Sequence, residues 1–158
     1  MKMKKILLLT LTSFTLLFAE ESVSAKVVYD LTTKNIPSFE MRILSAIAAN
    51  KTHYEKSLRE LDVTVVIHGG AYRFFTISPS KTDYKDDTAL IKAHANIAKR
   101  LKTMVDTYDV EFVMCGAGMP KHNLQAKDIF KFVTIIPNST IGLIDRQNEG
   151  YAYIPVGD

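Results

Sequence analysis

The chain has 158 residues, of which 47% are hydrophobic and 23% charged, and this suits one globular domain rather than two. The composition excludes a disordered, collagen-like or coiled-coil protein. The formal net charge of +3 is too balanced to predict binding to nucleic acid or to an anionic membrane surface.

The first 25 residues have the pattern of a secretory signal peptide. Three lysines among the first five residues precede an uncharged apolar run, residues 6–18, which is too short to span a bilayer. The tripeptide that ends at Ala25 places small residues where a signal peptidase cuts. We therefore expect cleavage after Ala25, with a second candidate site after Ala19, and a periplasmic mature domain of residues 26–158.

Short apolar runs rich in β-branched residues predict the strands of the mature chain. Such runs are typical of buried parallel strands. They lie at residues 26–31, 63–68, 110–115, 133–136 and 151–155.

Apolar residues at helical spacing connect the first three of these runs. Pro37 fits the first turn of a helix whose apolar positions continue to Ala48. The strongest helical pattern follows the second run and extends from Leu90 to Tyr108. After the third run, residues 116–120 are expected to form a loop.

The last third of the chain continues the alternation of strands and helices. A short helix is expected at residues 126–130. Asn138 or Ser139 would cap a further helix through Arg146, and Gly150 would end it. Alternating strands and helices imply right-handed parallel crossovers, so we predict a single three-layer α/β domain with a mostly parallel sheet of about five strands.

The first candidate site is Cys115, the only cysteine of the chain, at the end of a predicted strand. Functional groups of open α/β sheets collect at that edge, and Gly116 begins a run of small residues that lets a reactant approach. Loop N–H groups, Lys121 and His122 are each expected to lower the pKa of the thiol and favour the nucleophilic thiolate. The alternative is a cysteine that packs as a small buried hydrophobe.

The second candidate site is the sequence His68-Gly69-Gly70, directly after the second predicted strand. Two glycines in this place can form an anion-binding nest of backbone N–H groups, and His68 could act as an acid, a base or a hydrogen-bond donor. The alternative is a tight turn with a partly buried histidine. The spacing matches neither a dinucleotide-binding motif nor a P-loop.

The remaining polar residues predict no metal site and no organic cofactor, because the four histidines are scattered and the cysteine is single. His94 lies on the apolar stripe of the long helix and is expected to pack there or at a subunit interface, whereas His53 is expected at the surface. The mixed-charge segment 81–87 is interpreted as a solvated loop, with a lid or subunit arm as the alternative.

These features together resemble the DsrE/DsrF-like family of sulfur-relay proteins. The resemblance rests on the glycines after His68, on Cys115 with its small-residue loop and the Lys121-His122 pair, and on the sequence Gly-Tyr-Ala-Tyr at 150–153. It implies the YchN-like fold, a parallel α/β sheet in small subunits that assemble as trimers or hexamers. It also implies that Cys115 accepts a sulfane sulfur as a persulfide and passes it on.

We therefore predict a periplasmic homo-oligomer, a trimer or hexamer, that binds or carries reactive sulfur through Cys115. Its partner would be a small sulfur-containing molecule or a sulfur-donor protein, and part of the long helix's stripe would pack between subunits. A rival hypothesis is a non-enzymatic binding or assembly module whose cysteine is buried and inert. A third is a cysteine-dependent hydrolase that uses His68 or His122 as its base.

Overall fold

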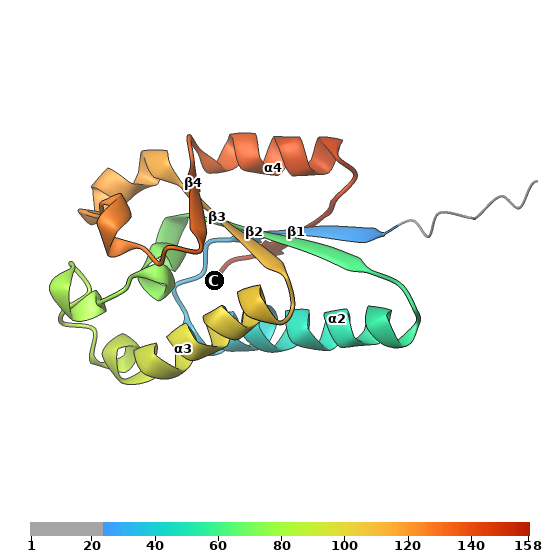
Figure 1. Cartoon of the computed structure of the whole chain (residues 1–158). Helices are drawn as coiled ribbons and strands as arrows, with labels where there is room; N and C mark the ends of the chain where they lie inside the picture. Colours follow the sequence, from blue (N-terminus) through green and yellow to red (C-terminus); the bar gives the residue numbers. More distant parts are fainter. Residues whose placement is uncertain (1–23) are drawn as a thin grey trace, which may run out of the picture.

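Five parallel strands form the centre of residues 24–158, the part of the chain that the computed structural model describes (Figure 1). All but the last two residues of the predicted signal peptide lie outside this part. The strand order is β4-β3-β2-β1-β5, and every pairing is parallel. The strands are β1 (Ala25–Leu31), β2 (Leu61–Ile67), β3 (Val110–Cys115), β4 (Val133–Ile136) and β5 (Ala152–Val156). The prediction of a single α/β domain with a parallel sheet is confirmed.

The strands differ in burial according to their place in the sheet. Nearly all residues of β2 and β3 are buried, since both faces of these central strands are covered. The edge strands β4 and β5 are largely exposed. Pro155 lies in β5, where an edge strand tolerates a missing N–H group.

One face of the sheet is covered by two long helical segments, which lie below the strands in Figure 1. The first is continuous and consists of α1 (Ile36–Phe39), a π-helical stretch η1 (Glu40–Ser45) and α2 (Ala46–Lys56). The second is α3 (Thr88–Asp106). As predicted, Pro37 lies in the first turn, where its missing N–H group would have no partner in any case.

The apolar stripe of α3 packs into the core of its own chain. Leu90, Ile97, Leu101 and Met104 are each at most 2% exposed, so the expectation that this stripe packs between subunits is corrected. Tyr108 lies beyond the end of the helix. The stripe's histidine, His94, packs as predicted: its Nε2 lies 2.8 Å from the carbonyl oxygen of Thr76 and its ring stacks against Phe130.

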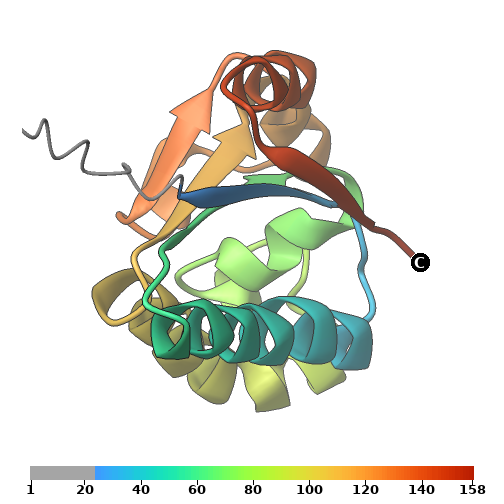
Figure 2. The ribbon, with the colours of Figure 1, turned by 90° about the vertical axis from the view of Figure 1, so that its right-hand side faces the viewer.

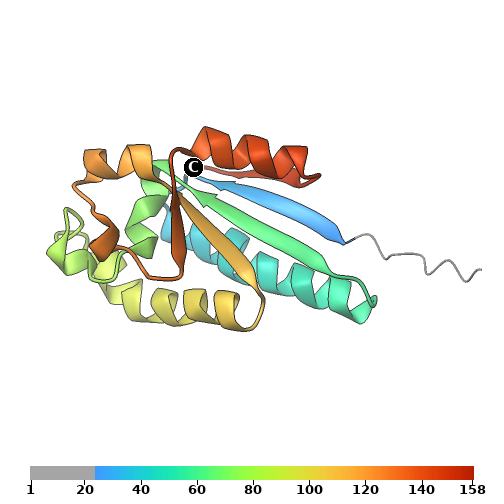
Figure 3. The same cartoon turned by 45° about the horizontal axis from the view of Figure 1, so that its top comes forward.

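Within residues 24–158, α4 (Ser139–Asn148) is the one α-helix on the opposite face (Figure 2). The chain moves outward from β1 through β2 and β3 to β4, and α4 then carries it back across the sheet to β5 (Figure 3). Since right-handed crossovers in opposite directions place their helices on opposite faces, α4 is separated from α1–α3. The predicted ends are confirmed: the Asn138 side chain accepts from the N–H of Ile141, and Gly150 has φ +90° after the helix.

Short 3₁₀ helices occupy the carboxyl edge of the sheet, and one of them confirms the short helix that was predicted at residues 126–130. They are η2 (Gly69–Phe75), η3 (Pro79–Lys81), η4 (Gly116–His122) and η5 (Ala126–Asp128). The predicted loop 116–120 is therefore corrected to part of a 3₁₀ helix, which ends where Asn123 adopts the left-handed conformation at φ +50°. The described residues contain no helix that is both long and apolar enough to cross a membrane.

Candidate functional site

Cys115 is the last residue of β3 and lies at the carboxyl edge of the sheet, as predicted. It is 7% exposed, so the side chain is nearly covered by its own chain. The 3₁₀ helix η4 begins at the next residue, and the β4–α4 connection lies alongside, because Ala117 donates to the carbonyl oxygen of Pro137 at 3.1 Å. The thiol is thus enclosed between η4 and the start of α4.

The pKa of the Cys115 thiol is lower than its ordinary value. Burial raises this pKa, but hydrogen bonds from the Tyr72 hydroxyl, from the N–H groups of Ser139 and Gly118, and from the Ser139 hydroxyl together outweigh burial. Each of these groups stabilises the thiolate, since each donates to the charged form. The environment of Cys115 therefore favours the nucleophilic state of the sulfur.

Tyr72 is a buried residue of η2 that links the segment after β2 to the end of β3. Its hydroxyl donates to the carbonyl oxygen of Cys115 at 2.6 Å, and the same hydrogen can turn to the sulfur when the thiol ionises. The pKa of Tyr72 is raised, first by burial and then by its interaction with Cys115. The phenol therefore stays protonated and can serve as a hydrogen-bond donor.

Ser139 brings the start of α4 to the thiol. It is the first residue of the helix, and the N–H groups of a first helical turn have no partner within the helix. A helix N-terminus carries partial positive charge, which lowers the pKa of a cysteine placed against it. Asn138 fixes this turn by capping it.

The glycines of η4 are required by close packing. A Cβ atom on Gly118 would lie 2.2 Å from the hydroxyl oxygen of Tyr72, which no real contact allows. A Cβ atom on Gly116 would lie 3.0 Å from the carbonyl oxygen of Ile136. Gly116, which the sequence offered as a binding residue, thus lets η4 pack against the end of β4 beside the thiol.

Lys121 and His122 lie at the far end of η4. Lys121 is exposed, and neither residue is among the groups that act on the thiol. Since a 3₁₀ helix rises roughly 2 Å per residue, six residues place Lys121 about 12 Å along the chain from Cys115. The expectation that this pair lowers the pKa of the thiol is therefore corrected. His122 instead packs against Tyr72, with the ring centres 4.8 Å apart.

His68 follows β2 and belongs to a hydrogen-bonded row across three strands. Its Nε2 lies 2.5 Å from Oδ1 of Asp30, a residue of β1. The other oxygen of that carboxylate accepts from the hydroxyl of Tyr153 in β5, at 2.6 Å. The side chains of His68 and Asp30 are 27% and 15% exposed, so the pair is accessible from one side.

The backbone around His68 does not form the expected anion nest. The N–H of His68 donates to the carbonyl oxygen of Leu31 at 3.0 Å, and the N–H of Gly70 donates to that of Thr32 at 2.9 Å. These two amides are thus used to join the turn to the end of β1. Gly69 is needed for its left-handed conformation at φ +59°, and Gly70 for close approach, since a Cβ atom there would lie 2.8 Å from Lys34 Cβ.

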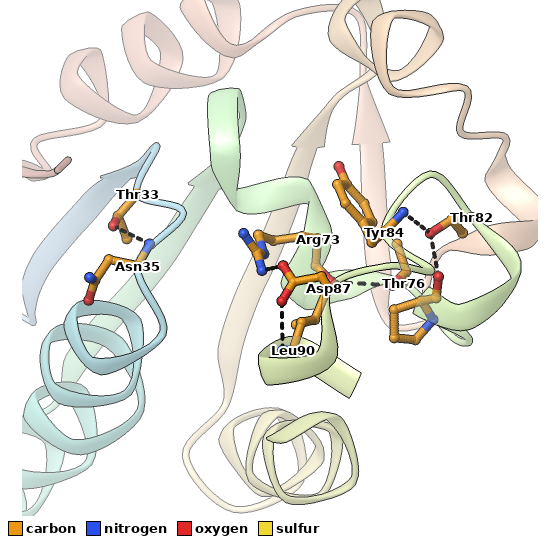
Figure 4. Close-up of polar contacts among 9 residues, drawn as sticks. Thr33, Asn35, Arg73, Thr76, Thr82, Tyr84, Asp87 and Leu90 are labelled. Carbon is orange, nitrogen blue, oxygen red and sulfur yellow. Dashed lines mark hydrogen bonds and ion pairs between the residues drawn. The ribbon is translucent and has the colours of Figure 1, made fainter. Parts of the chain in front are cut away.

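The charged segment 81–87 is fixed at its end by Asp87 and in its middle by Tyr84 (Figure 4). Arg73 forms an ion pair with Asp87, whose carboxylate also accepts from the N–H of Leu90 and caps α3. The hydroxyl oxygen of Tyr84, in the middle of the segment, lies 3.2 Å from Nδ1 of His122. Burial raises the pKa of Tyr84 to about 12. Lys81, Asp83, Lys85 and Asp86 are exposed, so the prediction of a solvated loop is confirmed, and Tyr84 ties this loop to η4.

Two further features bear on ligands. Within residues 24–158, no three His, Cys, Asp or Glu side chains cluster as a metal site would require. A cavity of about 810 Å³ lies beside the first turn of α1 and is lined by Lys34, Arg73 and Asp158 among others. Neither Cys115 nor His68 lines this cavity, so the thiol lies outside it.

Cys115 and His68 could be identified from the sequence, but the groups that act on the thiol could not. Tyr72 and Ser139 lie far from Cys115 in the sequence, and ordinary turn or capping roles would explain both residues. Asp30 could have been identified as a functional residue, because it is acidic and lies near the end of an otherwise apolar strand.

Comparisons with known proteins support the fold. A family model described as the DsrE/DsrF-like family matches residues 26–156. An uncharacterized protein of Aquifex aeolicus (strain VF5) is 37% identical over 59 residues, which are 37% of this chain and 26% of that protein. The match thus spans about a quarter of the relative's length. The solved structure of a protein of unknown function, MTH1491 from Methanobacterium thermoautotrophicum, superimposes with a TM-score of 0.56 at 18% identity, covering 84% of this chain and 99% of that one.

Proposed function

The chain belongs to the DsrE/DsrF-like family, and from this premise we propose that it is a periplasmic sulfur carrier. In this proposal Cys115 accepts a sulfane sulfur as a persulfide and passes it to an acceptor. The family is associated with sulfur relay, and by this resemblance we assign the sulfur-accepting position to Cys115.

The observation that carries the proposal is the position of Cys115 at the carboxyl end of β3, beside the first turn of α4 and the hydroxyl of Tyr72. A buried thiol is ordinarily harder to ionise, because burial disfavours the charged form. Here the hydrogen bonds from Tyr72, Ser139 and Gly118 reverse that effect. A cysteine that served as packing would need no such set of donors.

The chemistry needs no redox cofactor. The Cys115 thiolate attacks the terminal sulfur of a donor persulfide, R–S–SH, so that a new S–S bond forms on Cys115 while the donor's S–S bond breaks. The donor leaves as a thiolate and takes up a proton. Transfer to the acceptor repeats the step in reverse, and thiol and persulfide exchange without net oxidation.

Location and assembly belong to the same proposal. The expected export signal implies a donor of the periplasm, either a small persulfide or a sulfur-donor protein. We propose a trimer or hexamer, now with an interface on the α4 side of the sheet rather than on α3. Three apolar side chains on this side of the sheet are 43–50% exposed: Ile141 and Ile144 of α4, and Tyr153 of β5, which pairs with Val28 of the α4-side core.

A second candidate function is a binding or assembly module with an inert cysteine. The observation in its favour is the 7% exposure of Cys115, which is typical of a packed residue. The two candidates predict opposite outcomes when the native protein meets a sulfur donor.

The test is intact-mass spectrometry of the folded protein after incubation with a small alkyl persulfide. The proposal predicts a gain of one sulfur atom, reversed by a thiol reductant and absent in Cys115→Ser. A native protein that gains no sulfur, although its unfolded chain does, would support the inert module instead.

A further inference from the structure

His68 and Cys115 occupy corresponding positions on neighbouring strands. The register between β2 and β3 ends with Ile67 opposite Met114, and one further residue on each strand sets His68 opposite Cys115. Neighbouring strands are about 4.8 Å apart. The two residues therefore stand side by side at the carboxyl edge of the sheet.

By alternation along their strands both residues point toward the face that α4 covers, and Cys115, at the edge of the sheet, also packs against the core of the other face. Val66 and Val113 are core residues of that face, and side chains two positions apart on a strand share a face. His68 and Cys115 each follow by two positions, and the backbone of both is extended. The action of Ser139, the first residue of α4, on the thiol agrees with this placement.

The hydrogen bonds of His68 fix the chemistry of its ring. The carboxylate of Asp30 can only accept, so Nε2 of His68 carries the hydrogen at the 2.5 Å contact. Nδ1 is then the ring nitrogen that can take up and return a proton. Tyr153 holds the second carboxylate oxygen, so Asp30 is itself fixed in position.

We propose that His68, positioned by Asp30 and Tyr153, is the proton-transfer residue for sulfur exchange at Cys115. This inference rests on the proposed function and adds a second chemical group to it. Other charged or titratable groups near the ring come from β1, β3 and β5, namely Asp30, Cys115 and Tyr153.

The transfer balances with His68 as both base and acid. Nδ1 takes the proton of the Cys115 thiol before the reaction, and the thiolate, which Tyr72, Ser139 and Gly118 stabilise, attacks the terminal sulfur of R–S–SH. The S–S bond to Cys115 forms, the donor's S–S bond breaks, and the departing R–S⁻ receives the same proton from His68. The products are the Cys115 persulfide and R–SH, with no electrons gained or lost.

His122, the other histidine near the site, is less suited to this role. Its Nδ1 lies 3.2 Å from the Tyr84 hydroxyl, and its ring packs on Tyr72. Tyr72 therefore lies between His122 and the thiol, whereas His68 adjoins Cys115 through the sheet register.

The test compares two reagents that differ in what their leaving group needs. A small alkyl persulfide releases an alkyl thiolate, which must be protonated, whereas methyl methanethiosulfonate releases a sulfinate, which needs no proton. In His68→Gln, which keeps a donor toward Asp30, we expect sulfur loading from the persulfide to slow about 100-fold. Modification by the thiosulfonate should change less than about twofold, since the groups that stabilise the thiolate remain.

Two further variants complete the design. His53→Gln changes an exposed histidine on the opposite face of the sheet and should leave both rates unchanged. Asp30→Asn should slow persulfide loading by a smaller factor and spare the thiosulfonate reaction, as expected for a positioning residue.

The outcomes separate the inference from the function on which it rests. Equal slowing with both reagents, or no slowing with either, would overturn the role of His68 while Cys115 still loads sulfur. If the wild-type protein loads no sulfur at Cys115, the carrier function itself fails.

Discussion

The two faces of the sheet contribute differently to the protein: one holds most of the core, and the other borders the reactive side chains. The face under α1–α3 carries a large aromatic and aliphatic core, in which Phe39 stacks on Phe74 with ring centres 4.1 Å apart. The buried core of the α4 face is small, with Val28, Val66 and Val113 as its fully covered residues. His68 and Asp30 lie at the edge of this second face, and Cys115 lies beside them at the carboxyl end of β3, where it also packs against the larger core.

This difference has a physical reason. A buried apolar layer stabilises the fold through the area it removes from water, and it has no place for partly exposed polar groups. A face with one helix leaves the carboxyl edge accessible, so His68 and Asp30 keep contact with solvent. Changes on the first face should therefore affect stability, and changes at the edge of the second should affect reactivity.

The largest expected effect is the loss of a core ring from the α1–α3 face. Phe112→Ala removes a 1% exposed ring that packs against Phe75, and it should lower the free energy of unfolding by about 3–5 kcal/mol. Asp145→Ala on α4, at an exposed position outside the proposed interface residues, should change it by less than about 0.5 kcal/mol. Chemical denaturation of both variants measures the difference, and similar losses would contradict the division between the faces.

A methyl group placed between η4 and η2 should cause a smaller loss in the free energy of unfolding. In Gly118→Ala the new Cβ would lie 2.2 Å from the Tyr72 hydroxyl, so one of the two segments must move. We expect a loss of about 1–3 kcal/mol in unfolding free energy. The rate of thiol alkylation at neutral pH should also fall, because the displaced hydroxyl no longer stabilises the thiolate. Unchanged alkylation would show that Tyr72 does not act on Cys115.

Removing only the hydroxyl of Tyr72 should change the reactivity of the Cys115 thiol while the packing of the ring stays the same. Tyr72→Phe leaves the ring in place, so stability should fall by only about 1 kcal/mol for the lost hydrogen bond. The pKa of the Cys115 thiol should rise, which the pH dependence of alkylation measures. Tyr29→Phe is the matched control, since its buried hydroxyl bonds to Asn50 and not to the thiol. A similar pKa in both variants would contradict the role of Tyr72.

The smallest effect concerns stability in alkali. The pKa of Tyr84 is raised by burial to about 12 from an ordinary value of 10.0, so the unfolded chain loses this proton first. The contribution of protonated Tyr84 to the free energy of unfolding is therefore complete below pH 10 and is lost as the pH rises toward 12. In Tyr84→Phe the free energy of unfolding should decline less between pH 10 and pH 12. An unchanged decline would show that other groups cause it.

Much of the fold could be predicted from the sequence, because strand and helix signals are local. The apolar run before Cys115 and the capping residue Asn138 report on their own segments, and both predictions hold. The arrangement around the thiol is not local. Tyr72 reaches Cys115 because two strands are neighbours, and Ser139 does so because α4 returns over the opposite face.

The same reasoning explains the corrected roles. Lys121 and His122 are near Cys115 in sequence, but a 3₁₀ helix carries them away from the sulfur. The glycines after His68 were interpreted as an anion nest. In the structure the N–H groups of His68 and Gly70 donate instead to carbonyl oxygens at the end of β1. Adjacency in sequence was a poor guide wherever the partner lay on another strand.

The most direct test of the account is the rate of alkylation of the native protein by iodoacetamide as a function of pH. We predict an inflection below the ordinary thiol pKa of about 8.5, unchanged in Lys121→Ala and absent with Cys115→Ser. An inflection at or above the ordinary value, or a thiol that reacts only after unfolding, would contradict the claim that Tyr72, Ser139 and Gly118 hold Cys115 ready for sulfur transfer.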